Sequence, residues 1–148
     1  MGCDEKWIRG DPRVLYVADN RRVLRAIDLR RFTIFDLDSW GDPFECAVII
    51  ADRRPIAKGE TIGIVLTDGT GASMIGNRVA RAAAELAGLN PGQVGLLRNR
   101  DAVINRAVIG LAKRCRADIV KRWEAHGRSG GKHGQSQLRY IGLVLRGA

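Results

Sequence analysis

Short apolar runs rich in β-branched residues, each followed at once by a polar cluster, constrain the fold of this chain most strongly. The runs occupy residues 14–17, 32–37 and 61–67. The polar clusters after them occupy residues 18–20, 38–43 and 67–71. Such runs, bounded by turn residues, predict buried strands. Because open α/β sheets bind ligands beyond the carboxyl ends of their strands, the three clusters predict one ligand-binding rim.

Segments with helical periodicity separate the predicted strands. Helices are predicted just after residue 20, where Val23, Leu24 and Ile27 share a face, and over residues 44–51 and 73–87. The alternation predicts an α/β fold with a Rossmann-like, mostly parallel sheet and flanking helices. The length of 148 residues fits a single domain over residues 1–148.

The longest predicted helix covers residues 101–125, with Asp101 as its N-cap. Its apolar stripe consists of Ile104, Val108, Leu111, Cys115 and Ile119. A flexible basic loop is predicted over residues 127–134, and a last strand over residues 138–145.

The positive charge of the chain lies in its last third. Residues 1–97 carry 13 Lys/Arg and 13 Asp/Glu, whereas residues 98–148 carry 12 and 3, so the whole net charge of +9 falls there. This asymmetry predicts a polyanionic partner, with nucleic acid first, although a solvated basic face is the alternative. The residues predicted to contact nucleic acid are Arg106, Lys113, Arg114, Arg116, Lys121, Arg128 and Lys132.

Composition excludes several other classes of protein. Cys3, Cys46 and Cys115 are odd in number and far apart, which excludes a disulfide framework. No metal site is predicted, because His126 and His133 have no cysteine or carboxylate cluster nearby. The sequence has no apolar run long enough for a transmembrane helix and no secretory signal. We therefore expect a cytoplasmic protein without a membrane partner.

Residues 36–43 contain more side chains that could bind a ligand than either of the other two polar clusters. Asp36, Asp38 and Trp40 lie close together in the sequence, and carboxylates beside an aromatic ring can bind and stack a nucleobase. The two acids could instead form a magnesium or acid–base pair, which we rank lower because neighbouring side chains of a strand point to opposite faces. For Asp19 and Asn20 the alternative is simple capping of the next helix.

Residues 35–43, FDLDSWGDP, resemble motif IV of class I, Rossmann-like S-adenosylmethionine-dependent methyltransferases. In the amino-methylating branch this loop reads Asn/Asp-Pro-Pro-Tyr/Phe, and in tRNA guanine N2-dimethyltransferases it resembles Asp-Leu-Asp-Pro-Tyr-Gly. The catalytic motif here would be Asp38-Ser39-Trp40-Gly41, with Ser for Pro and Trp for Tyr. The resemblance implies that Asp38 and the Ser39 carbonyl accept hydrogen bonds from a target amine, and that Trp40 stacks on a splayed base.

Other segments follow the order of this family. Residues 3–5 resemble the tip of its second strand, residues 14–20 its third strand, residues 61–68 its fifth, and residues 138–145 the late strand of its terminal hairpin. The resemblance implies S-adenosylmethionine as cofactor. Asp4 would hold its ribose, Asp19 and Asn20 its adenine, and Asp36 is a further candidate contact.

The sequence departs from the family at one point. The first strand and the Gly-x-Gly loop of motif I should precede Cys3, and Gly69-x-Gly71 follows the wrong strand. The chain could thus be a C-terminal portion, a reduced descendant that lost cofactor binding, or a protein whose missing strand comes from another chain. An exposed sheet edge would also favour a homodimer.

The leading expectation is a methyltransferase-like protein acting on a base amino group of RNA or DNA, with a neutral α/β part over residues 1–97 and a basic part over residues 98–148. Its alternatives are a nucleic-acid-binding protein with a degenerate fold of this type and a small-molecule methyltransferase.

Overall fold

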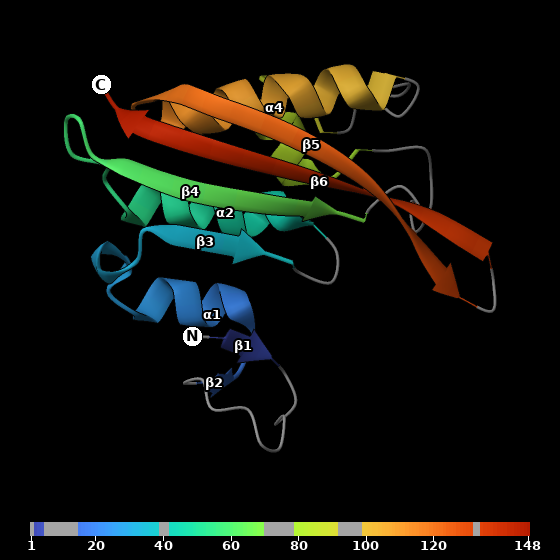
Figure 1. The fold of residues 1–148 in the computed structure, drawn as a ribbon, viewed down its shortest axis with the longest axis horizontal. Helices are drawn as coiled ribbons and strands as arrows, with labels where there is room; N and C mark the ends of the chain where they lie inside the picture. Colours follow the sequence, from blue (N-terminus) through green and yellow to red (C-terminus); the bar gives the residue numbers. More distant parts are fainter. Residues whose placement is uncertain (1, 5–14, 39–41, 70–78, 92–98, 132–133) are drawn as a thin grey trace.

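The computed structural model describes residues 2–4, 15–38, 42–69, 79–91, 99–131 and 134–148. Strands β1 (Gly2–Asp4) and β2 (Leu15–Val17) form a parallel pair, in which Cys3 lies opposite Tyr16. This pair is a sheet of its own, separate from the larger sheet that carries the core (Figure 1).

The larger sheet has four strands in the order β3-β4-β6-β5. They are β3 (Ile34–Leu37), β4 (Thr61–Asp68), β5 (Ala117–Gly131) and β6 (Gly134–Gly147). Strands β3 and β4 are parallel, and β6 is antiparallel to both of its neighbours. The expectation of a mostly parallel sheet was wrong here, because the chain returns from β5 to β6 through a hairpin instead of a helical crossover.

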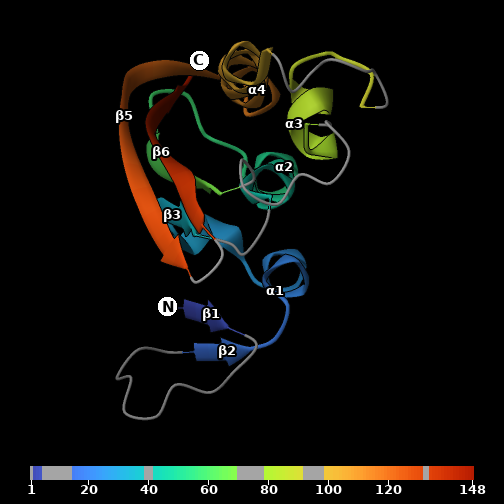
Figure 2. The ribbon, with the colours of Figure 1, turned by 90° about the vertical axis from the view of Figure 1, so that its right-hand side faces the viewer.

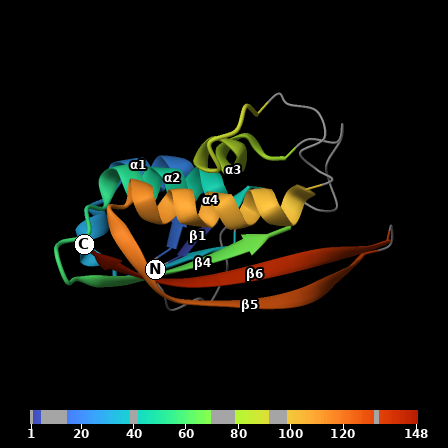
Figure 3. The ribbon, with the colours of Figure 1, turned by 90° about the horizontal axis from the view of Figure 1, so that it is seen from above.

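The helices cover one face of this sheet, as Figures 2 and 3 show. They are α1 (Asn20–Ala26), the 3₁₀ turn η1 (Leu29–Arg31), α2 (Pro43–Arg53), α3 (Arg81–Leu86) and α4 (Arg100–Arg114). None of the described helices is both long and apolar enough to cross a membrane. The fold is therefore α/β, with one helical layer packed on a mixed sheet.

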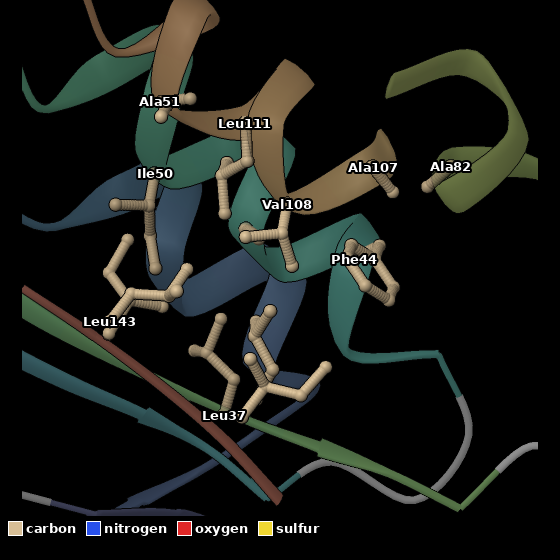
Figure 4. Close-up of a cluster of buried hydrophobic side chains, with 14 of the residues drawn as sticks. Leu37, Phe44, Ile50, Ala51, Ala82, Ala107, Val108, Leu111 and Leu143 are labelled. Atoms are coloured by element: carbon tan, nitrogen blue, oxygen red, sulfur yellow. The ribbon is translucent and has the colours of Figure 1, made fainter. Parts of the chain in front are cut away.

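The core lies between the sheet and α2, α3 and α4. Figure 4 shows Leu37 and Leu143 of the sheet pointing toward Ile50 of α2 and Val108 and Leu111 of α4. Alternate residues of β4 face the helices, and Ile62, Ile64 and Leu66 are almost fully buried. Each such side chain stabilises the fold by about 2 kcal/mol through the removal of apolar surface from water.

The first half of the chain follows its sequence pattern closely. The strands predicted at 14–17, 32–37 and 61–67 and the helices after residues 20 and 43 are confirmed. Helix α2 begins with Pro43, and the Asp42 carboxylate accepts a hydrogen bond from the Phe44 N–H at 2.9 Å. These local signals act within one turn, which is why the sequence alone reveals them.

The helix predicted over residues 73–87 is confirmed only for α3. The prediction was wrong for Val79 and Ala80, which precede the helix, and residues 73–78 lie outside the described ranges. Gly88 ends α3 with a φ of 69°. The Leu89 N–H bonds the Ala84 carbonyl and the Gly88 N–H bonds the Glu85 carbonyl, the paired arrangement that glycine permits at a helix end.

The long helix predicted over residues 101–125 was wrong beyond Arg114. Its N-cap is Asn99, and Asp101 lies in the first turn. Arg116 takes a left-handed φ of 52°, after which the chain becomes strand β5. The spacing of Ile119 fits a helical stripe, but β6 offers a strand edge, and pairing with it satisfies the backbone of residues 117–131.

The flexible loop predicted over residues 127–134 was also wrong. Strand β5 continues to Gly131 and β6 starts at Gly134, so most of that segment is paired across the hairpin. Glycine content indicated flexibility, whereas the tertiary pairing extends both strands. The strand predicted at 138–145 is confirmed and is longer than expected.

Candidate functional site

The carboxyl ends of β3 and β4 meet at one edge of the larger sheet. The strands are parallel and in register, with Leu37 opposite Leu66. Asp38 follows β3 directly, and Asp68 is the last residue of β4. The described residues at these two strand ends, Asp38 and Asp68, thus lie at one edge, whereas the third predicted cluster follows β2 in the separate sheet.

Asp68 is the most deeply buried acid at this edge, with only 1% of its surface exposed. The Arg100 guanidinium, in the first turn of α4, donates to it with 2.5 Å between Nη2 and Oδ2. Sequence reasoning did not assign this pair. In the sequence, the only indication of the Asp68–Arg100 pair was the basic residue Arg100 at the start of a helix in residues 98–148.

Asp42 lies near the same edge. Burial raises the pKa of Asp42 to about 6, the Phe44 N–H opposes this rise, and the nearby charges of Glu45 and Asp68 add to it. The edge therefore holds an acid with a raised pKa beside an arginine-bound carboxylate.

The acids of the proposed motif IV are exposed. Phe35 and Leu37 of β3 point into the core, so Asp36 between them lies on the opposite face, next to Val65 of β4. Asp38 is exposed at the end of the strand. Asp36 and Asp38 are two positions apart, so strand alternation puts both on the side away from the core and does not separate them.

The other residues of the motif, Ser39, Trp40 and Gly41, lie outside the described residues. In the parts of the chain that the structure describes, no three His, Cys, Asp or Glu side chains come together as a metal site. Of the catalytic motif over residues 38–41, the structure describes only Asp38, and the role of the motif stays a prediction.

Asp19 caps α1, which is the alternative that the sequence left open. Its Oδ1 accepts a hydrogen bond from the Arg21 N–H at 2.8 Å, and the Arg21 guanidinium binds the same carboxylate, with 2.7 Å between Nη2 and Oδ2. The side-chain hydrogen bond from Arg21 holds the pKa of Asp19 well below its usual range. Asn20 is the first residue of α1.

Asp4 ends β1 in the position opposite Val17, so the ends of β1 and β2 share one edge. Asp4 and the Asp19 cap thus belong to neighbouring strand ends. Arg21 also binds Glu45 of α2, with 2.9 Å between Nη1 and Oε2, which connects α1 to the second helix.

The predicted nucleic-acid contacts do not share one helix. Arg106 and Lys113 are exposed on α4, Arg116 is exposed at the turn after it, and Lys121 is exposed on β5. Arg114 binds Asp52 of α2 through two hydrogen bonds of 2.6 and 2.9 Å.

The remaining two predicted contacts are Arg128 and Lys132. Arg128 belongs to β5, and Lys132 lies outside the described residues. The basic part is thus a helix and a hairpin side by side.

A polar network that sequence reasoning missed connects the hairpin to α4. Arg139 of β6 is buried and donates to Glu124 of β5 at 2.8 Å and to Asp101 of α4 at 2.9 Å. Arg139 also reaches the Asn105 side chain at 3.1 Å. Arg122, which did not fit the predicted helix faces, binds Glu124 and Asn105 in the same network.

Comparison of the chain with known protein families, with curated proteins and with solved structures finds no match.

Proposed function

We propose that this chain is a methyltransferase-like protein that acts on nucleic acid, with S-adenosylmethionine as methyl donor and a base amino group as acceptor. The observation that carries the proposal is the arrangement of the strand ends. Asp38, the first residue of the proposed catalytic motif over residues 38–41, follows β3 at the edge where the parallel strand β4 also ends. A rim of this kind is where open α/β sheets bind ligands.

The strand order supports the Rossmann-like part of this proposal. The resemblance assigns β4 to the fifth strand and β6 to a terminal hairpin. In the structure β6 lies between β4 and β5 and is antiparallel to both, so the hairpin closes one side of the sheet. The parallel pair β1–β2 agrees with the assignment of residues 3–5 and 14–20 to neighbouring strands of the family.

In this proposal, residues at the ends of β1 and β2 hold the adenosine part of the cofactor. Asp4 and Asp19 belong to neighbouring strand ends, and a carboxylate that already binds Arg21 keeps lone pairs for a further donor. The cofactor would supply a methyl group on a positively charged sulfur. Asp38 would accept a hydrogen bond from the target amine and so orient the nitrogen lone pair.

In this proposal, the basic part of the chain, residues 98–148, binds the phosphates of the nucleic acid. Arg106, Lys113 and Lys121 are exposed cations on neighbouring elements of that part. Cations of this kind contact phosphates and make binding depend on salt but little on sequence.

A second candidate function is nucleic-acid binding without catalysis. The observation that favours it is the engagement of Asp19, whose two carboxylate oxygens are bound by Arg21 and by the α1 backbone. In that case the chain would bind nucleic acid through the exposed cations of residues 98–148 and would not transfer a methyl group.

Titration calorimetry with S-adenosylmethionine separates the two candidates. Binding at millimolar cofactor or tighter, together with methyl transfer to an unmodified RNA or DNA, is expected for the enzyme. Absence of binding at that concentration would leave the non-catalytic candidate.

Substitution of Trp40 tests the assigned role of motif IV. Trp40→Ala should weaken use of the nucleic acid more than cofactor binding, because the ring is assigned to the base. Trp40→Phe, which keeps an aromatic ring, serves as the matched control. Equal loss of both affinities would contradict the role.

A further inference from the structure

One face of the four-stranded sheet, here called the outer face, points away from the helices. No described element covers it, as Figures 2 and 3 show. Strand alternation puts the residues between the core positions on this face. One row across the four strands consists of Asp36, Val65, Gly142 and Trp123, which lie side by side in the pairing register.

Two large aromatic side chains are exposed on the outer face. Trp123 of β5 is 48% exposed, and Tyr140 of β6 is 36% exposed. Tyr140 lies opposite Ala125, the next outward residue of β5 after Trp123. The two rings thus occupy adjacent rows on adjacent strands, a diagonal spacing of about 7–8 Å between backbones.

Two glycines leave room for the Trp123 and Tyr140 rings to lie close to the backbone of the sheet. A Cβ on Gly142 would lie 2.1 Å from Cε2 of the Trp123 indole, so the ring occupies the space of a missing side chain. A Cβ on Gly127 would lie 3.0 Å from Cε2 of Tyr140. Rings supported in this way offer a broad face to a planar partner instead of projecting into solvent.

Charged groups flank the rings. The Lys121 ammonium lies 5.9 Å from the centroid of the Trp123 ring, and Arg146 is exposed on the same face of β6. The acids of this face are Asp36, on the far strand β3, and Asp118, opposite Arg146. Lys121 thus places a cation beside the Trp123 ring, within the part of the chain that holds the whole net charge of +9.

We propose that the outer face binds single-stranded nucleic acid, with one base stacked on Trp123, another on Tyr140, and a phosphate near Lys121. Unpaired bases expose π-faces that stack on aromatic side chains, whereas a duplex hides them. The positive part of the chain complements a polyanion better than it complements a second copy of itself. The inference rests on the nucleic-acid partner of the proposed function and adds the strandedness of the ligand and the face that holds it.

The test compares single-stranded and duplex ligands on the full chain. Fluorescence anisotropy would use a labelled oligouridine of about 12 nucleotides and a duplex of the same length. Trp123→Ala and Tyr140→Ala should each weaken oligouridine binding about tenfold or more, because one stacking contact is lost, while duplex binding changes less than about twofold. Tyr140→Phe, which keeps the ring, should retain binding.

A matched control lies on the helical side of the molecule. Ile109 is a large apolar side chain exposed on α4, so Ile109→Ala should leave oligouridine binding unchanged. Circular dichroism melting of each variant checks the fold. A variant that melts like the wild type and loses only the single-stranded ligand supports the proposal.

Three results would overturn it in distinguishable ways. If the wild type binds neither ligand, the nucleic-acid partner of the proposed function fails together with this inference. If the wild type binds oligouridine and Trp123→Ala binds it equally well, only this inference fails. If sedimentation shows a dimer that Trp123→Ala dissociates without loss of nucleic-acid binding, the outer face binds a second copy of the chain instead.

Discussion

Arg139 of β6 reaches Asp101 in the first turn of α4, with 2.9 Å between Nη1 and Oδ1, although 38 positions separate them in the sequence. The same guanidinium binds Glu124 of β5. One buried arginine thus joins both strands of the hairpin to the helix that carries much of the core.

Replacement of Arg139 tests this connection. Arg139→Ala should lower the free energy of unfolding by about 2 kcal/mol, because it leaves Glu124 without its buried cation and removes a packed side chain. Urea denaturation measures the change. Arg114→Ala, which breaks the more exposed pair with Asp52, is the control and should cost less than about 1 kcal/mol. Equal costs for the two variants would show that burial does not distinguish them.

Gly142 provides the space in which the Trp123 indole lies. Gly142→Ala should push the ring toward solvent, because the new methyl group would lie 2.1 Å from Cε2. Tryptophan fluorescence, with Trp7 and Trp40 replaced by Phe, should shift to longer wavelength and become easier to quench. The control is Gly63→Ala on β4, where the nearest atom, Cγ1 of Ile34, is 3.6 Å from the new methyl group. A red shift in both variants would count against a specific contact between Trp123 and Gly142.

The pH dependence of stability should report on Asp42. Burial raises its pKa from 3.8 to about 6 in the folded protein, so the folded chain holds this proton more tightly than the unfolded chain does. The resulting stabilisation is full below about pH 4 and is lost as pH rises through 6. Asp42→Asn, which keeps an N-cap side chain, should remove this loss, which is of the order of 2 kcal/mol.

Denaturant unfolding at pH 4 and pH 7 measures the effect as a difference between the wild type and Asp42→Asn. Asp52→Asn serves as a control for the general effect of removing a carboxylate from α2. A wild type and an Asp42→Asn variant with parallel pH profiles would contradict the raised pKa.

Salt dependence tests which cations contact nucleic acid. Arg106→Gln and Lys113→Gln should each reduce the slope of log affinity against log salt by about 1, because each removes one phosphate contact. Arg114→Gln should change the slope much less, since its guanidinium is bound to Asp52. The measurement is duplex binding by anisotropy from low to physiological salt. If the slope of log affinity against log salt is similar for the wild type and for Arg106→Gln, Arg106 of α4 does not contact phosphate.

The prediction of elements succeeded where the signal was local. Asp42 and Pro43 mark the start of α2, and the β-branched run before Asp68 marks β4, because capping and alternation depend on a few neighbouring residues. The placement of Asp38 near the end of β4 also followed, since parallel strands end at the same edge. The roles of Asp4, Asp19, Asn20 and the motif IV residues stay predictions.

The last third shows what sequence pattern could not decide. Ile119 continues the helical spacing of α4, yet it pairs with Leu145 in the sheet. The backbone of β5 finds its hydrogen-bond partners in β6, whose residues lie farther along the chain, so no local periodicity reports the pairing.

By itself the sequence determined the alternation of strands and helices in the first half of the chain, the polar ends of those strands and the confinement of the net positive charge to residues 98–148. Only the tertiary structure decided the mixed order β3-β4-β6-β5, the Asp68–Arg100 and Arg139 contacts, and the exposure of Trp123 on the outer face. The physical reason is the distance along the chain over which each feature acts. Capping, alternation and charge content belong to short segments, whereas strand pairing and buried ion pairs depend on which distant segments share a low-dielectric interior.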